Sequence, residues 1–304
     1  MRGMASPAEW TPPSDHLIRA ADLALRPWRA WTSPVFHGLE NLPRSGPALL
    51  VGNHTLYGVI DAPLIFFEIH RRHGVWVRSL ADHAHWLIPG WRRIMDVGGS
   101  VDGTPGNCRA LLDAGQMVVI FPGGAREAAR SRHDLYRLQW ERRLGFARLA
   151  VEAGCPIVPF GSVGAEEMFT TVLDSDNRLL APARGLARAV LGDRAKGRDD
   201  FMMPLARGIG PTLVPRPERL YFRFGTPIDT TPWQGREHDD LAVTEVRDLA
   251  RKSVQEIIDT LRAEQSTDKN RTPLARLTRT LTLTRNTPLT PRQHPQGAPQ
   301  DERP

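Results

Sequence analysis

The sequence predicts an α/β protein in which helices flank a mostly parallel central sheet. Five short apolar runs each end in a polar or glycine-rich turn, and helical patterns lie between several of these runs. Alternation of strands and helices is typical of a mainly parallel sheet covered by helices. The chain has 304 residues, of which 40% are hydrophobic and 24% charged, enough for one such domain with extensions.

The predicted strands are the apolar runs at 48–51, 75–80, 117–121, 157–160 and 220–224. The helices predicted from apolar residues at three- or four-residue steps include 107–114, 140–153 and 236–264. In sheets of this type, ligands bind at the carboxyl ends of the strands. We therefore expect the turns that follow the first and third predicted strands to lie at one edge of the sheet.

An N-terminal segment, residues 1–32, is expected to precede a domain that spans residues 33–264. A helical pattern with an apolar side and arginines opposite runs from His16 to Trp31, and Pro27 is expected to kink or end it. Tryptophans beside arginines suit a helix at a lipid–water interface. The alternative is a helix packed on its own domain, because any surface helix is amphipathic.

A basic tail, residues 265–304, is rich in Thr, Arg, Pro and Gln and is predicted to be disordered. Residues 266–304 hold seven basic and three acidic side chains, so they carry four of the six net positive charges. Such a tail attracts anionic membrane as readily as nucleic acid. The chain has no zinc-finger spacing and no RNP-type signature, and we therefore do not expect it to bind nucleic acid.

The composition predicts a cytoplasmic protein that associates peripherally with membranes. The sequence contains no run of about 18 uncharged apolar residues, so we predict no transmembrane helix. The N-terminus lacks the basic and then apolar pattern of a secretory signal. The two cysteines, Cys108 and Cys155, are too few for a disulfide framework and are expected to be buried.

A candidate general base follows the first predicted strand. His54 lies just past that strand, and an unperturbed pKa of about 6.5 lets an imidazole accept a proton near neutrality. A carboxylate on the far ring nitrogen would fix the tautomer, and Asp61 is the nearest candidate in the sequence. From this segment alone, the alternative is that His54 ends a strand and Asp61 caps the next helix.

A glycine-rich turn, Phe121–Glu127, follows the third predicted strand. Two glycines let the backbone approach a ligand closely, and their amides together with Arg126 suit an oxyanion or a phosphate. A plain tight turn with a surface arginine explains the same residues.

We predict no metal site. His70, His73, His83 and His85 are close in the sequence, but two arginines separate the first pair, which is unfavourable beside a cation. No glutamate accompanies them in an H-E-x-x-H pattern.

Several blocks of the chain together resemble the phospholipid/glycerol acyltransferase superfamily. Residues 38–43 precede Asn53-His54, and the blocks at 121–126 and 156–159 follow in the order and spacing of that family. The resemblance covers roughly residues 36–229. The residues after Phe121 are most similar to the branch that holds the plant phytyl ester synthases and the diacylglycerol acyltransferase-like membrane proteins.

The resemblance implies a glycerolipid acyltransferase fold and the transfer of a fatty acyl group from acyl-CoA or acyl carrier protein to a lipid hydroxyl, without a cofactor. It implies that His54 is the base and that Asp61 orients it. The residues expected to bind substrate are Asn53, Phe121, Pro122, Gly123, Gly124, Arg126 and Glu127. The expected partners are the lipid acceptor, the acyl thioester and a membrane surface, contacted through residues 16–31 and the basic tail.

Three departures from the family pattern bear on the acceptor. Val59 stands where the family has its Asp, and Asp61 lies two residues later. Gly123 replaces a glutamate, and Pro105 stands where the family has an arginine. The loss of a phosphate ligand favours a neutral acceptor, such as diacylglycerol or a long-chain alcohol, over lysophosphatidate. The alternatives are a 1-acylglycerol-3-phosphate acyltransferase, a lipid hydrolase and a non-catalytic lipid-binding protein.

Overall fold

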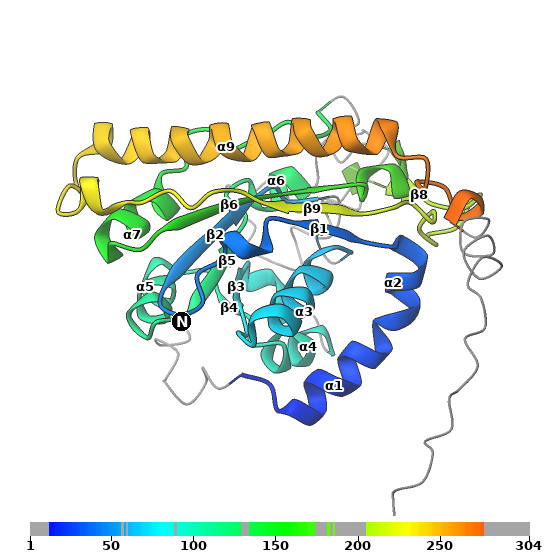
Figure 1. Ribbon diagram of the computed structural model, residues 1–304, viewed down its shortest axis with the longest axis horizontal. Helices are drawn as coiled ribbons and strands as arrows, with labels where there is room; N and C mark the ends of the chain where they lie inside the picture. The colour runs from blue at the N-terminus through cyan, green and yellow to red at the C-terminus, as the bar shows by residue number, and fades with distance from the viewer. Residues whose placement is uncertain are drawn as a thin grey trace, which may run out of the picture.

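The computed structural model describes residues 12–55, 58, 60–87, 90–128, 134–173, 181–182, 185 and 205–276. In this part of the chain, seven strands form a central sheet in the order β1-β9-β6-β2-β5-β3-β4 (Figure 1). Their bounds are β1 Val35–His37, β2 Ala48–Gly52, β3 Arg78–Ala81, β4 Val101–Asp102, β5 Met117–Ile120, β6 Ile157–Val163 and β9 Tyr221–Phe224. A separate antiparallel pair consists of β7 Thr170–Leu173 and β8 Leu205–Arg207.

The sheet is mostly parallel, as predicted. β2 runs parallel to both β5 and β6, and β3 runs parallel to β5 and β4. The exception is β9, which pairs antiparallel with β6 and carries β1 parallel to itself at the sheet edge. All five residues of β2 are buried, as expected for a central strand that is covered on both faces.

Helices cover both faces of the sheet. One core contains Leu111 of α5 (Pro105–Asp113), Ala147 of α7 (Gly145–Ala153) and Ile258 of α9 (Asp240–Thr267). Figure 1 shows α9 running along β6 and β9 on that side. The core on the opposite face contains Leu64 and Ile65 of α3 (Ala62–His73).

The remaining helices are short. α4 spans Trp91–Val97 and α6 spans Gly124–Ala128, and the 3-10 helices are η2 Leu39–Asn41, η3 His83–Leu87, η4 Glu166–Met168 and η7 Thr231–Trp233. No helix among the described residues is long and apolar enough to cross a membrane.

The N-terminal segment forms two helices rather than one kinked helix. α1 spans Asp15–Ala24 and α2 spans Arg26–Thr32, so that Pro27 lies in the first turn of α2. The missing N–H of a proline costs nothing in a first turn, because no intrahelical acceptor exists there. Trp28 packs against the core that contains α3, whereas Leu17 and Leu23 of α1 are 48% and 58% exposed.

The C-terminal region is ordered further than the sequence indicated. α9 continues to Thr267, and the next residue, Asp268, accepts hydrogen bonds from Arg219 (2.9 Å) and from the hydroxyl of Tyr221 (2.7 Å). Helix α9 therefore continues beyond the predicted domain boundary at residue 264, and an ion pair and a hydrogen bond attach Asp268 to the domain. Residues 277–304 lie outside the described residues.

Candidate active site

Asn53 joins the ends of two neighbouring strands. The Asn53 side chain is buried after β2; its amide donates to the carbonyl oxygen of Ser162 (3.0 Å), and its oxygen accepts from the N–H of Ser162 (2.9 Å). Both side-chain groups of Asn53 are thus used to fasten β2 to β6. The contacts make Asn53 a support for the residue that follows it.

His54 stands at the carboxyl edge of the sheet, half-buried, with its ring centroid 4.8 Å from that of Phe121. Its Nδ1 lies 3.0 Å from the carbonyl oxygen of Thr55. A carbonyl oxygen can only accept, so this contact requires the proton on Nδ1. In the neutral imidazole, Nε2 is then the nitrogen that accepts a proton.

Gly58 lies directly against the His54 ring. Its φ is +57°, and a Cβ built on it would lie 2.0 Å from Cε1 of His54. A side chain at this position would displace the imidazole and strain the backbone. Val59, where the family has its Asp, lies outside the described residues.

Asp61 is fully buried at the start of α3, and both carboxylate oxygens accept from hydroxyl groups. The Thr55 hydroxyl donates at 2.9 Å and the Ser162 hydroxyl at 2.6 Å. Burial raises the pKa of Asp61, and the two hydroxyl hydrogen bonds oppose that rise. The carboxylate therefore reaches His54 through Thr55, which differs from the direct contact with the ring that the sequence suggested.

Glu127 on α6 is a second buried carboxylate beside His54. Its Oε2 accepts from the backbone N–H of His54 (2.9 Å), and its Oε1 accepts from the N–H of Gln139 (2.7 Å). A Cβ built on Gly123 would lie 2.0 Å from Cδ of Glu127. The glycine thus leaves room for the carboxylate that holds the main chain of His54.

The glycine turn between β5 and α6 is held by an arginine that was not among the predicted site residues. Arg143 donates to the carbonyl oxygens of Pro122 (2.8 Å) and Gly123 (3.0 Å). The N–H of Gly124 donates to Phe121 (2.9 Å), so the turn itself uses that amide. The N–H groups of Gly124 and His54 are therefore both used by acceptors within the protein.

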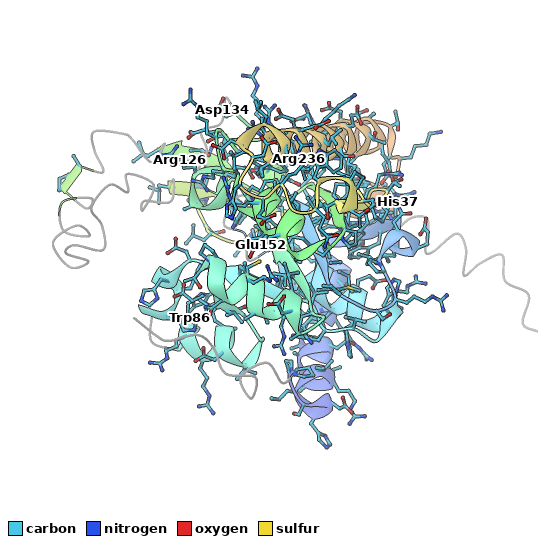
Figure 2. All side chains as sticks on the ribbon, turned by 90° about the vertical axis from the view of Figure 1, so that its left-hand side faces the viewer. His37, Trp86, Arg126, Asp134, Glu152 and Arg236 are labelled. Carbon is cyan, nitrogen blue, oxygen red and sulfur yellow. The ribbon has the colours of Figure 1, made fainter. Side chains whose placement is uncertain are left out.

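Arg126 lies at the outer edge of the domain in Figure 2. Its side chain is 47% exposed, and its guanidinium forms an ion pair with the carboxylate of Glu141 at an N–O distance of 2.5 Å. An exposed ion pair contributes little to stability, so a phosphate can compete for this guanidinium. Pro105, the other position compared with family arginines, begins α5 next to its N-cap, Thr104.

The histidines that are close together in the sequence make separate contacts in the structure. His70 packs edge-on to Trp76, His83 lies 3.2 Å from Asp102, and His85 accepts from the indole of Trp91 (3.0 Å). Burial lowers the pKa of His85. Among the described residues, no group of three or more His, Cys, Asp or Glu side chains is placed to hold a metal ion.

The structure thus brings the turns after β2 and β5 together, as expected for parallel strands. It adds Thr55, Ser162 and Arg143 to the residues found from the sequence. Thr55 was adjacent to His54, and Arg143 lay near a family block, but Ser162 is 101 residues from Asp61 and carries no local signal. A base supported by buried carboxylates at a sheet edge is typical of an enzyme that activates a hydroxyl.

Comparisons with known proteins identify an acyltransferase domain. Residues 33–163 match the family model described as Acyltransferase. Phytyl ester synthase 2 of Arabidopsis thaliana is 30% identical over 259 residues, which are 80% of this chain and 36% of the plant protein. The "DGAT1/2-independent enzyme synthesizing storage lipids" of Bos taurus is 33% identical over 178 residues, 54% of this chain and 52% of the bovine protein.

The chain therefore spans about a third to a half of the length of these relatives. Among solved structures, the crystal structure of the 1-acyl-sn-glycerophosphate acyltransferase PlsC from Thermotoga maritima is similar, with a TM-score of 0.48 and 17% identity over 80% of each chain.

Proposed function

We propose that this chain transfers a fatty acyl group from an acyl thioester, acyl-CoA or acyl carrier protein, to a lipid hydroxyl. The observation that supports this proposal best is the contact between Nδ1 of His54 and the carbonyl oxygen of Thr55 (3.0 Å). It makes Nε2 the basic nitrogen of the neutral ring. The match to the acyltransferase family model supplies the reaction class.

In the proposed reaction, Nε2 of His54 takes the proton of the acceptor hydroxyl as its oxygen attacks the thioester carbonyl. The carbon–oxygen bond forms, the carbon–sulfur bond breaks, and the proton passes from His54 to the leaving thiolate. Asp61 holds the Thr55 hydroxyl and so acts on the ring through Thr55. Glu127 fixes the main chain of His54. No metal or covalent enzyme intermediate is needed.

The test of this mechanism is His54→Ala. Loss of a positioned base typically lowers the rate about 10²–10⁴-fold. We expect such a loss with an unchanged melting temperature, measured with acyl-CoA and a panel of long-chain alcohols, diacylglycerol and lysophosphatidate. Near-normal turnover in the variant would overturn the mechanism. Release of free fatty acid without ester formation would instead identify a hydrolase, and lipid binding without turnover would identify a binding protein.

For the acceptor, we propose a neutral alcohol such as diacylglycerol or a long-chain alcohol. The support from this chain is that Pro105 stands where a family arginine is expected. The named relatives are a phytyl ester synthase and a storage-lipid enzyme. The second candidate acceptor is lysophosphatidate, because Arg126 is still present.

Arg126→Ala separates the two acceptors. With a neutral acceptor, the Michaelis constant for the acceptor should hardly change, since the guanidinium would contact at most the donor. With a phosphate acceptor, the loss of a charge-assisted contact worth about 1.5–3 kcal/mol should raise that constant about tenfold or more. Arg251→Ala, an exposed arginine on α9, is the matched control. Faster turnover of lysophosphatidate than of every neutral alcohol would overturn this assignment.

We also propose peripheral membrane contact through residues 16–31. Leu17 and Leu23 project from α1 with about half of their surface exposed, next to the arginines of the same segment. A Leu17→Glu, Leu23→Glu variant should float less readily with anionic vesicles, and unchanged flotation would contradict the assignment.

A further inference from the structure

Three segments that are far apart in the sequence meet at the end of the molecule where α2, β8 and the end of α9 lie (Figure 1). The indole of Trp31 on α2 donates to the carbonyl oxygen of Pro215 (3.1 Å). The guanidinium of Arg276 donates to the carbonyl oxygens of Trp31 (3.2 Å) and Pro217 (3.0 Å). These bonds join α2, the loop after β8 and the turn after α9 into one surface.

The loop after β8 has a tip that is ordered by its own hydrogen bonds. The N–H of Gly208 donates to Thr212 (2.7 Å), and the N–H of Ile209 donates to Val214 (2.8 Å). A Cβ on Gly208 would lie 1.8 Å from the carbonyl oxygen of Val214, so only glycine permits this closure. The tip is therefore a built feature that holds its side chains in fixed positions.

The joined segments expose large apolar side chains, which we call the apolar end. Leu213 and Leu274 are 69% and 71% exposed, and Val214 is 50% exposed. Ile209 and Trp31 are 44% and 37% exposed. Single exposed apolar residues are ordinary, but these five lie on segments that are hydrogen-bonded to one another, and a concentration of exposed apolar side chains is typical of a site of contact with a partner or a membrane.

The charge of the same segments indicates the partner. Residues 26–32, 205–219 and 268–276 hold eight basic and two acidic side chains. Glu218 pairs with Arg271 and Asp268 with Arg219, each at 2.9 Å, and Arg29 pairs with Asp22 of α1 (2.7 Å), which reduces the excess of basic over acidic residues from six to five. A net positive surface with exposed apolar groups complements an anionic lipid bilayer.

We propose that the apolar end docks the protein on an anionic lipid surface, with Leu213, Val214 and Leu274 entering the bilayer interface. This extends the membrane contact of the proposed function from the N-terminal helices to two further segments. Helix α2, which carries Trp31 of the apolar end, also contacts the segment between His54 and Asp61, because the indole of Trp28 donates to the carbonyl oxygen of Ile60 (2.9 Å). A lipid acceptor would therefore be taken up beside the surface that holds the protein.

The first experiment uses the full chain and a Leu213→Glu, Val214→Glu variant. Flotation is measured with vesicles of phosphatidylcholine and phosphatidylglycerol and with phosphatidylcholine alone. We expect binding to the anionic vesicles, and a partition coefficient lowered about tenfold or more in the variant, because two apolar side chains no longer enter the interface. The matched control is Leu241→Glu, Leu249→Glu on α9, which replaces residues that are 83% and 41% exposed and should bind as the unmodified chain does.

The second experiment reports insertion directly. Cys108 and Cys155 are buried, and burial raises their pKa values to about 12 and about 11, so neither reacts readily at neutral pH. An environment-sensitive fluorophore on Leu213→Cys should brighten and shift to shorter wavelength with anionic vesicles, whereas the same label on Leu241→Cys should not respond.

Equal flotation of the tip variant and the unmodified chain would overturn the proposal, as would equal losses in the tip and control variants. A tip variant that changes only the oligomeric state would assign the surface to a second copy of the chain and also overturn it. Turnover of a detergent-dispersed alcohol, measured without vesicles, should be the same in the tip variant and the unmodified chain. Absence of that turnover in both would contradict the proposed function while leaving the docking result valid.

Discussion

Two buried carboxylates support His54, and they differ in the donors that hold them. Asp61 accepts from the hydroxyls of Thr55 and Ser162, whereas Glu127 accepts from two backbone N–H groups, one of them that of His54. A hydroxyl can either donate or accept, but a backbone N–H can only donate. The Asp61 carboxyl group can therefore be protonated or replaced by an amide while each hydroxyl keeps a hydrogen bond. The same change at Glu127 leaves a backbone N–H without an acceptor.

The largest difference is expected between Glu127→Gln and Asp61→Asn. An amide at Glu127 turns an NH₂ group toward a backbone donor and leaves a buried donor unsatisfied, which costs about 1–3 kcal/mol. At Asp61, a hydroxyl can rotate to accept from the new NH₂ group, and we expect a cost of about 1 kcal/mol or less. Urea unfolding of both variants at neutral pH measures the two costs.

The turnover number kcat is a second measure of the difference between Glu127→Gln and Asp61→Asn. Glu127→Gln should also lower kcat, because the displaced main chain moves the His54 ring. Equal losses of stability in the two variants would show that the type of donor does not matter. A larger loss in Asp61→Asn would show that its hydroxyl partners do not reorient.

The sequence was informative where the structure is local and periodic. The apolar runs that became β2, β5, β6 and β9 were predicted because a central strand buried on both faces leaves a continuous hydrophobic signature. β1 and β4 have three and two residues, too short for any periodicity. The antiparallel direction of β9 was not predictable, because an apolar run carries no information on strand direction.

The candidate site shows the same limit. His54 and the glycine turn were identified because each directly follows a buried run, and parallel strands bring such turns together. The contact of Asp61 with Ser162 joins residues 101 positions apart, and the role of Gly123 depends on where the Glu127 side chain folds back. Both depend on tertiary packing. The predicted helix at 140–153 begins only at Gly145, since the residues before it form the turn that places Arg143.

A pH series tests the burial of Asp61. Its pKa is raised above 3.8 by desolvation, so the folded chain keeps this proton while the unfolded chain loses it. Relative to Asp61→Asn, the unmodified chain should therefore lose stability as pH rises from 3.8 to the raised pKa, and change no further above it.

Asp229 supplies a control of opposite sign. Hydrogen bonds from the backbone and side chain of Thr231 lower the pKa of Asp229. Relative to Asp229→Asn, the unmodified chain should lose stability as pH falls from 3.8 through the lowered pKa. The same trend in both pairs of proteins would contradict the assignment for Asp61.

The smallest expected effects separate the two hydroxyls around Asp61. Thr55→Val and Ser162→Ala each remove one hydrogen bond to the carboxylate, and each should cost about 0.5–1.5 kcal/mol of stability.

Only Thr55 also supplies the carbonyl oxygen that accepts from Nδ1 of His54. Release of its side chain from Asp61 lets that carbonyl move, and the ring loses the contact that fixes its tautomer. Thr55→Val should therefore lower kcat and shift its pH profile, whereas Ser162→Ala should leave both nearly unchanged. Thr55→Ser keeps the hydroxyl and should restore the rate. Equal losses of kcat in Thr55→Val and Ser162→Ala would mean that Asp61 acts on the fold of the site as a whole and not on His54 through Thr55.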